Sequence, residues 1–358
     1  MFHLWYDNEL GWGRCSDRAR RPMKERGEEL VGTKPAVAVT RPDLPGGGLA
    51  RLAERAVLRL WQGGGRPGVD DLVELIGDGC AVICVNGDPV TDRLLSECRN
   101  LRFVAVASAG YDSVDVEAAV RRGIPVANTP GVLAETVADL TIALIIWARR
   151  GLGAAERNVR LGGWTSIDDA DLSGLDVHGA TLGLVGYGAI GRAVAARAAG
   201  FGLSVIAHDP LSGNQAGVRF CPLDELLRES DIVSLHVPLT AETKGMIGER
   251  ELRLMKPTST LINTSRGAII DEPALVRALR EGWIHSAGLD VQEREPNPDS
   301  NAPLLTLPNA VVLPHVGSAT LAARSSMVDL AVDNVLRFVE GGLALTPVRE
   351  SQQVLEGQ

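Results

Sequence analysis

The sequence predicts an α/β protein built on two doubly wound parallel sheets. Short runs rich in β-branched residues alternate with stretches whose apolar residues recur every three or four positions, the spacing of an amphipathic helix. This alternation occurs in two series, one ending near residue 127 and one beginning near residue 181. Because parallel strands need crossover connections, which are usually helices, each series is expected to form one helix-covered sheet.

The first series supplies four predicted strands, at 36–40, 81–85, 103–107 and 125–127, and three predicted helices, at 49–61, 69–76 and 115–122. A long helix is predicted at 132–149 and contains the best candidate for a membrane span, the nine residues 140–148. A bilayer takes about 18 apolar residues, so we expect a buried helix instead.

The second series supplies six predicted strands, at 181–185, 204–207, 232–235, 260–263, 286–289 and 310–313, and four predicted helices, at 189–200, 223–229, 249–255 and 272–280. A last helix is predicted at 320–339, and it would make the first domain discontinuous if it packs back onto the first sheet. We therefore predict a poorly ordered N-terminal extension at 1–34 and a first domain in two pieces, at 35–135 and 320–346. The second domain is predicted at 136–319, and a frayed polar tail at 347–358.

The composition excludes several classes of function. The 358 residues carry 36 Lys and Arg against 45 Asp and Glu, and a net charge of −9 disfavours a nucleic-acid-binding surface. The five cysteines include no second pair at metal-ligand spacing, so we predict no metal site and reduced thiols. The N-terminus is not expected to be a signal peptide, because Asp7 and Glu9 interrupt it and no apolar core follows. A cytoplasmic protein with neither membrane nor nucleic-acid partners is expected.

A glycine-rich motif predicts the cofactor. It matches G-x-G-x-x-G, follows strand 181–185 and opens helix 189–200, and consists of Gly186, Tyr187, Gly188, Ala189, Ile190 and Gly191. In this context the glycines permit a tight turn, close approach of a pyrophosphate and close helix–strand packing, so the second domain is predicted to be a Rossmann-like dinucleotide-binding domain. Asp209 follows the next strand, where a carboxylate binds ribose hydroxyls and repels a 2′-phosphate, and therefore favours NAD(H) over NADP(H).

Three polar residues follow predicted strands of the second domain: Arg266, Glu295 and His315. Ligands of open α/β sheets bind outside the carboxyl ends of the strands. Beside a nicotinamide, these side chains suffice to reduce a 2-oxo acid, because the Arg can bind the carboxylate and polarise the carbonyl while the His supplies a proton. A carboxylate beside the His favours its charged form. We predict that the three residues are catalytic.

These segments resemble those of the D-isomer-specific 2-hydroxyacid dehydrogenases. The resemblance spans about residues 35–345 and is carried by the glycine motif with Asp209 and by the segments 261–267, 287–296 and 313–320. It implies that the first domain is Rossmann-like, flavodoxin-like in topology, and binds the substrate. It also implies that the cofactor is lined further by His236, Val237, Pro238, Thr264, Ser265, Asp290 and Gly317, and that the substrate is bound by Asn86, Gly87, Ala109, Gly110 and Arg266.

Within the family, the segments 131–135, 303–305 and 317–320 are most similar to glyoxylate/hydroxypyruvate reductases. Trp164 lies where the family often builds a dimer arm, which implies a homodimer. Two alternatives stay open. The same machinery could act on D-3-phosphoglycerate or another D-2-hydroxy acid, or the chain could be a non-catalytic dehydrogenase-like protein that senses NADH.

Overall fold

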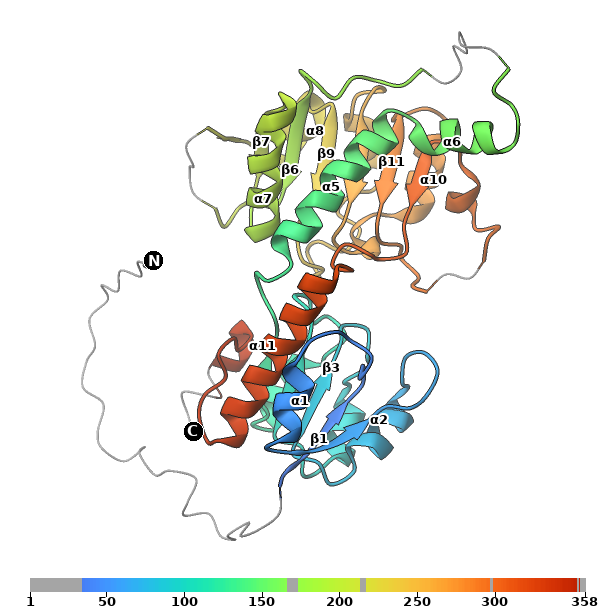
Figure 1. Cartoon of the computed structure of the whole chain (residues 1–358). Helices are drawn as coiled ribbons and strands as arrows, with labels where there is room; N and C mark the ends of the chain where they lie inside the picture. Colours follow the sequence, from blue (N-terminus) through green and yellow to red (C-terminus); the bar gives the residue numbers. More distant parts are fainter. Residues whose placement is uncertain (1–33, 166–172, 213–216, 297–298, 353, 355–358) are drawn as a thin grey trace, which may run out of the picture.

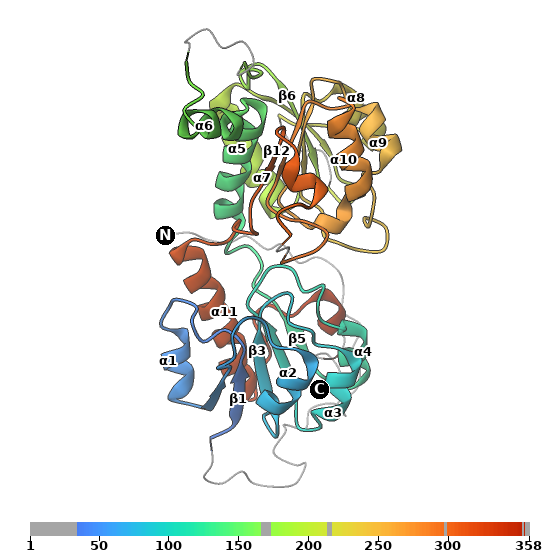
Figure 2. The ribbon, with the colours of Figure 1, turned by 90° about the vertical axis from the view of Figure 1, so that its right-hand side faces the viewer.

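The computed structural model describes residues 34–165, 173–212, 217–296, 299–352 and 354. It has two lobes, each built around a parallel sheet (Figures 1 and 2). All but the last residue of the predicted N-terminal extension lie outside the described residues. Within the described part of the chain, no helix combines the length and the apolar character that a membrane span requires.

The first lobe contains a five-stranded sheet in the order β2-β1-β3-β4-β5. This is the flavodoxin-like order of doubly wound sheets, as the resemblance implied. The central strands are buried on both faces and consist almost entirely of Ala, Val, Ile and Phe. The elements are β1 (Ala36–Val39), α1 (Gly48–Ala53), β2 (Val57–Leu60), α2 (Val69–Ile76), β3 (Ala81–Cys84), α3 (Asp92–Glu97), β4 (Phe103–Val106), α4 (Val116–Arg121) and β5 (Val126–Ala127).

The second lobe contains a seven-stranded parallel sheet in the order β12-β11-β10-β9-β6-β7-β8. The order begins from β6 and runs outward in both directions, which is the Rossmann arrangement with one added strand. The prediction of two parallel-sheet α/β domains is therefore confirmed. The strands are β6 (Thr181–Val185), β7 (Ser204–His208), β8 (Arg219–Phe220), β9 (Ile232–Leu235), β10 (Thr260–Asn263), β11 (Ser286–Leu289) and β12 (Ala310–Val312).

Helices cover both faces of this second sheet (Figure 2). Helix α5 (Ala134–Arg149) packs on α7, β10 and β11, while α9 and α10 pack together on the opposite side. The remaining helices are α6 (Leu152–Arg160), α7 (Ala189–Ala198), α8 (Leu223–Glu229), α9 (Glu249–Leu254) and α10 (Glu272–Arg280), with short 3-10 turns at Ala199–Phe201, Gly267–Ile269 and Pro303–Thr306.

The last long helix, α11 (Leu321–Val339), returns to the first lobe. It packs against α1, β3 and β4, and Phe338 stacks on Phe103 with ring centroids 4.9 Å apart. Val332 and Val335 of this helix are fully buried in the core of the first sheet. The first lobe therefore draws on both ends of the described chain, while the residue boundaries of the two domains stay a prediction.

Two predicted elements are wrong. The helix predicted at 49–61 ends at Ala53, and Val57–Leu60 is instead the edge strand β2, which pairs with β1. The tail predicted to fray from 347 onward is packed as far as Ser351: Val348 is 3% exposed and donates its N–H to the Val126 carbonyl. The Ser351 hydroxyl accepts the Val126 N–H at 3.0 Å, within the 3-10 turn Arg349–Ser351. In both cases a contact distant in the sequence decides the local structure.

Candidate active site

A cavity of about 570 Å³ lies between the two lobes. One side is formed by loops of the first lobe and the other by loops that follow strands of the second. Of the predicted site residues, the cavity is lined by Ala109, Gly110, Ile190, His236, Val237, Pro238, Thr264, Ser265, Arg266, Asp290, His315 and Gly317. Asn86, Gly87 and Glu295 lie outside this lining but contact residues near it.

The glycine motif forms the turn between β6 and α7. Gly186 has a φ of +95°, and a Cβ there would lie 2.7 Å from the His236 carbonyl oxygen. A Cβ at Gly191 would lie 2.4 Å from the Gly186 oxygen, so this glycine lets α7 pack closely on the turn. At Gly188, apart from its chain neighbours, no atom of the described chain lies within 4 Å of an added Cβ. The open side at Gly188 and the start of α7 at Ala189 fit a pyrophosphate at the helix N-terminus.

Asp209 directly follows β7, beside this turn. Its carboxylate accepts the backbone N–H of Tyr187 at 2.7 Å and that of Leu211 at 2.8 Å. Burial would raise the pKa of this carboxyl, but the backbone hydrogen bonds outweigh it and the pKa is lowered. The charged group at this strand end fits the ribose of a dinucleotide. The Tyr187 side chain is buried edge-on against Phe220, so only its backbone faces the turn.

His315 and Glu295 form a close pair. His315 Nδ1 lies 2.6 Å from Glu295 Oε2, and the other carboxylate oxygen accepts the Gln292 N–H at 2.8 Å. Burial would raise the Glu295 pKa, but the hydrogen bond and charge of His315 outweigh it and the pKa is lowered. Glu295 therefore stays ionised at neutral pH and orients the imidazole, leaving Nε2 as the ring nitrogen available to a substrate.

The backbone of His315 is held in an uncommon conformation. Its φ is +55°, in the left-handed region that side chains other than glycine seldom adopt. Asp290 fixes this turn, because its carbonyl accepts the His315 N–H and its carboxylate accepts the N–H groups of Val316 and Gly317. Burial raises the Asp290 pKa in spite of these two hydrogen bonds. Asp290 thus acts on the site through the backbone.

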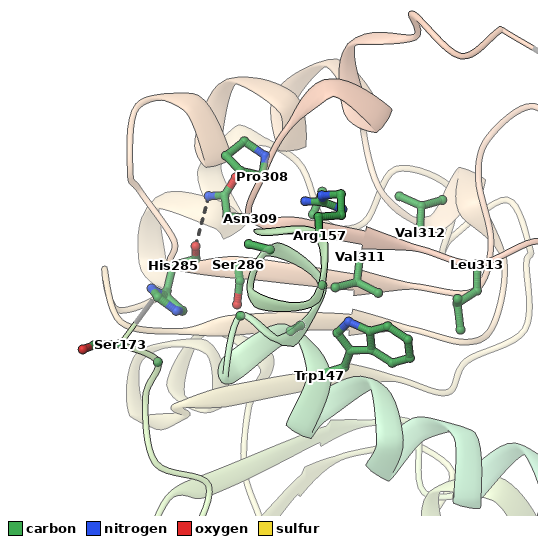
Figure 3. A pocket seen from close by; sticks show the side chains of 16 residues that line it. Trp147, Arg157, Ser173, His285, Ser286, Pro308, Asn309, Val311, Val312 and Leu313 are labelled. Carbon is green, nitrogen blue, oxygen red and sulfur yellow. Dashed lines mark hydrogen bonds between the residues drawn. The ribbon is translucent and has the colours of Figure 1, made fainter. Parts of the chain in front are cut away.

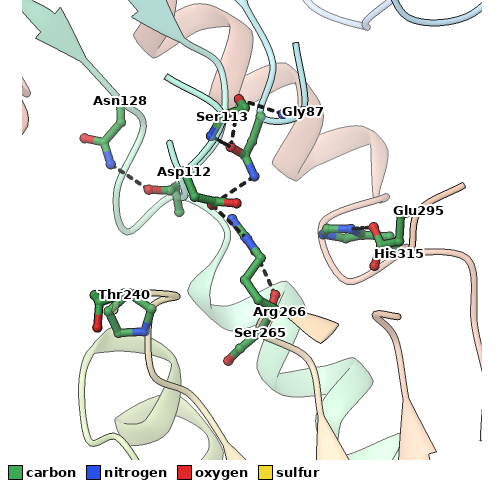
Figure 4. A network of polar contacts seen from close by, with 12 residues as sticks. Gly87, Asp112, Ser113, Asn128, Thr240, Ser265, Arg266, Glu295 and His315 are labelled. Atoms are coloured by element: carbon green, nitrogen blue, oxygen red, sulfur yellow. Dashed lines mark hydrogen bonds and ion pairs between the residues drawn. The ribbon is translucent and has the colours of Figure 1, made fainter. Parts of the chain in front are cut away.

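Arg266 reaches from the loop after β10 across to the first lobe (Figure 4). Its Nε donates to Asp112 Oδ1 at 2.9 Å, and its Nη1 donates to the Ser265 carbonyl at 2.7 Å. The Nη2 nitrogen lies against Gly110, 1.7 Å from where a Cβ would stand. Arg266 therefore meets the predicted substrate loop directly.

The other predicted residues are held by internal contacts. His236 Nε2 lies 2.9 Å from the Ser234 hydroxyl, its buried Nδ1 has no partner among the described residues, and burial lowers its pKa to about 4. The Ser265 hydroxyl donates its hydrogen to the Leu235 carbonyl, so this hydrogen is not available to a cofactor. The Thr264 hydroxyl lies 3.2 Å from that of Thr141, a buried residue of α5 that sequence reasoning missed.

Sequence reasoning also missed cavity residues of the first lobe: Tyr111, Asp112, Arg349 and Glu350. Tyr111 and Asp112 directly follow the predicted loop residues, so their position was a signal that could have been used. The C-terminal pair carried no such signal. The Tyr111 hydroxyl donates to Glu350 at 3.3 Å. The pKa of Tyr111 is raised, mainly because the side chain is partly buried and also because the Glu350 charge is close.

A second cavity, of about 330 Å³, lies away from these residues on the second lobe (Figure 3). It is bounded by α5, α6 and the edge strand β12, and its wall includes Trp147, Val311 and Val312. Here Asn309 donates to the His285 carbonyl, and the ring of His285 is held neutral because burial lowers its pKa. Within the described residues, no three His, Cys, Asp or Glu side chains are grouped to hold a metal ion.

Comparison with known proteins gives concordant matches. Residues 142–317 match the family model of the D-isomer specific 2-hydroxyacid dehydrogenase NAD binding domain. The chain is 44% identical to a glyoxylate reductase of Korarchaeum cryptofilum over 90% of its length and 98% of that protein.

Among solved structures, it resembles the TT0316 protein of Thermus thermophilus (TM-score 0.82, 42% identity, 87% of this chain and 99% of that one). It also resembles an NADPH-dependent glyoxylate/hydroxypyruvate reductase of Sinorhizobium meliloti, solved with NADP and malonate (TM-score 0.79, 38% identity, 89% of this chain and 98% of that one).

Proposed function

The chain belongs to the D-isomer specific 2-hydroxyacid dehydrogenase family, and from this premise we propose that it reduces a small 2-oxo acid of the glyoxylate or hydroxypyruvate type to the D-2-hydroxy acid. The observation that carries the proposal is the meeting of Arg266, the His315–Glu295 pair and the Ala109–Gly110 loop at one cavity. Arg266, which can bind a carboxylate, and His315, which can donate a proton, thus line a single cavity, and Ile190 of the glycine motif lines it as well.

Each side chain has a distinct role in this proposal. Arg266 and the backbone N–H groups of Ala109 and Gly110 bind the substrate carboxylate, and Arg266 also polarises the carbonyl. His315 donates a proton from Nε2 to the carbonyl oxygen, and Glu295 holds the ring at Nδ1 and balances its charge. A bound nicotinamide supplies the hydride. His315→Asn should lower turnover by about 10²–10⁴-fold and leave NADH binding intact.

We propose NADH as the preferred cofactor. Asp209 supports this preference, because its ionised carboxylate would repel a 2′-phosphate at the position that the Gly186–Gly191 turn offers to the adenosine ribose. The solved relative from Sinorhizobium meliloti is named as NADPH-dependent, so family membership alone does not decide the cofactor. The preference of this chain is therefore a property to be measured.

We propose further that the chain forms a homodimer through the surface around the cavity of Figure 3. Large apolar side chains are exposed there and on the neighbouring α6 segment: Trp147 is 40%, Val159 55%, Leu161 85% and Trp164 63% exposed. A second copy would cover this surface and the edge strand β12. The free thiols of the described cysteines support a reducing, cytoplasmic environment.

A panel of 2-oxo acids tests the function. Glyoxylate, hydroxypyruvate, pyruvate and 3-phosphohydroxypyruvate would each be offered with NADH and with NADPH, and oxidation would be followed at the nicotinamide absorbance. We expect glyoxylate or hydroxypyruvate with NADH to give the highest kcat/KM. A clear preference for the phosphorylated acid would assign a different substrate. NADH binding without turnover of any acid would indicate a sensor and overturn the proposal.

A further inference from the structure

We infer that Asp112 is a positioning residue that orients Arg266 for the substrate carboxylate. The inference rests on the proposed function, because it assigns that carboxylate to Arg266. Asp112 lies in the loop after β4 and Arg266 in the loop after β10, so their ion pair crosses from one lobe to the other. The two side chains are 31% and 21% exposed, which places the pair at the wall of the cavity.

Two of the three guanidinium nitrogens of Arg266 donate hydrogen bonds within the protein. Nε is held by Asp112 and Nη1 by the Ser265 carbonyl. Nη2 donates no hydrogen bond within the described residues and lies beside Gly110. A carboxylate placed between Nη2 and the Gly110 N–H would thus receive both contacts. Without Asp112 the guanidinium could rotate about its flexible stem, and Nη2 would lose this defined direction.

A network of hydrogen bonds fixes Asp112 in turn (Figure 4). Asp112 Oδ1 accepts from the Asn86 amide at 3.1 Å, and the Asn86 oxygen accepts the Ser113 N–H and hydroxyl at 3.2 and 3.1 Å. The Ser113 hydroxyl accepts the Gly87 N–H at 2.8 Å. The loops after β3 and β4 are therefore joined by hydrogen bonds, and the position of both loops determines where Asp112 meets Arg266 across the cleft. Through this network Asn86 and Gly87 would act on a cavity that they do not line.

Variants of Asp112 test the inference by their effect on substrate binding. Asp112→Ala should raise KM for glyoxylate or hydroxypyruvate about tenfold, the effect of one charge-assisted hydrogen bond, with a smaller change in kcat. The inhibition constant of oxamate, a 2-oxo acid analogue, should rise equally, and NADH affinity should stay as in the parent. Asp112→Asn retains the acceptor oxygen and should recover most of the loss. Asp112→Glu keeps the charge but displaces it, and should also raise KM.

Asp43→Ala is the matched control. Asp43 is a first-lobe aspartate that pairs with Arg41 through two hydrogen bonds at 2.9 and 2.8 Å, outside the cavity between the lobes. It should leave KM, kcat and oxamate inhibition unchanged. If Asp112→Ala melts without a cooperative transition or fails to bind NADH, the KM values of Asp112→Asn and Asp112→Glu are compared with that of the parent instead.

A double-mutant cycle separates action through Arg266 from a general effect on the fold. In an Arg266→Ala background, Asp112→Ala should add no further increase in KM. Additive losses, or a KM of Asp112→Ala like that of the parent, would overturn the inference. A KM below that of the parent would also overturn it, because Asp112 would then compete with the substrate for Arg266. A parent that reduces no 2-oxo acid would instead overturn the proposed function, and this inference with it.

Discussion

Replacing Gly110 with alanine should disable the active site without unfolding the protein. Gly110 lies in the loop after β4, and its backbone N–H, which alanine keeps, is proposed to bind the substrate carboxylate. An alanine Cβ at this position would lie 1.7 Å from Arg266 Nη2 and 2.9 Å from Arg266 Cζ. The substitution therefore adds one methyl group at the point where the two lobes meet around the substrate.

The size of the effect follows from this geometry. Non-bonded heavy atoms rest about 3.5 Å apart, so the tip of Arg266 must retreat by roughly 2 Å. Misplacing a catalytic group by about 1 Å can cost about 10²-fold in rate. We therefore expect kcat/KM to fall by at least about 10²-fold. The displaced group is the end of a flexible, partly exposed side chain, so the free energy of unfolding should change little.

The assay compares Gly110→Ala with Gly64→Ala, a control in the first-lobe loop between β2 and α2. Apart from its chain neighbours, no atom of the described chain lies within 4 Å of a Cβ at Gly64, and that variant should behave as the parent. Steady-state reduction of hydroxypyruvate, NADH binding and thermal melting would be measured for all three proteins. A Gly110→Ala enzyme with kcat/KM within threefold of the parent would refute the placement of Arg266 at this loop.

Four further predictions concern other residues. Glu295→Gln should lower kcat for the reduction, because a neutral amide pairs less strongly with His315 Nδ1 and holds the imidazole ring less firmly; an unchanged kcat would contradict the pairing. Asp209→Ala should narrow the ratio of kcat/KM for NADH over NADPH, and an unchanged ratio would remove the ribose role. Ser351→Ala leaves a buried backbone N–H of β5 without a partner and should lower the free energy of unfolding by about 1–3 kcal/mol in urea titrations, while kcat/KM stays constant. The His236 pKa of about 4 lies below the ordinary 6.5, so the unfolded state binds more protons between these values; the free energy of unfolding should fall by at most about 3 kcal/mol as the pH falls through that window, and His236→Gln should reduce this dependence.

Much of the fold could be predicted because the local patterns of the second lobe are consistent with its packing. Strands β9, β10 and β11 and helices α8 and α10 begin and end at the predicted residues. Their sequences alternate fully buried strands with one-sided helices, so periodicity alone identifies them. Helix α3 was missed because its only apolar residues, Leu94 and Leu95, are adjacent and therefore show no helical period.

Strand β2 shows where this reasoning fails. The helical pattern of 49–53 continues in spacing through 57–60, and no proline or strong strand former separates the two segments. Pairing with β1, from Ala36↔Val57 to Val39↔Leu60, overrides that pattern. This contact lies about 20 residues away in the sequence, so a short window cannot detect it.

In the candidate site, too, the residues specified by local sequence patterns could be predicted, and the contacts between distant segments could not. Arg266 and His315 follow strands, and in a parallel α/β sheet the carboxyl ends of all strands face one edge, so their meeting could be predicted from the order of elements. The pairing of Arg266 with Asp112 could not, because it depends on how closely the two sheets face each other. The same holds for Glu350, which reaches Tyr111 only because the C-terminal segment lies beside β5.

The two lobes therefore contribute different parts of one cavity. The second lobe supplies the dinucleotide turn, Arg266 and His315 from strand ends that its own sequence specifies. The first lobe supplies two loops joined by Asn86 and Asp112; α11 covers its sheet, and the C-terminal segment forms a bridge with β5. Since Arg266 meets Asp112 and Gly110 across the cleft, the position of this proposed substrate-binding group depends on the separation of the lobes. A motion that separates the lobes would break the Arg266–Asp112 pair, and closure would restore the direction of Nη2.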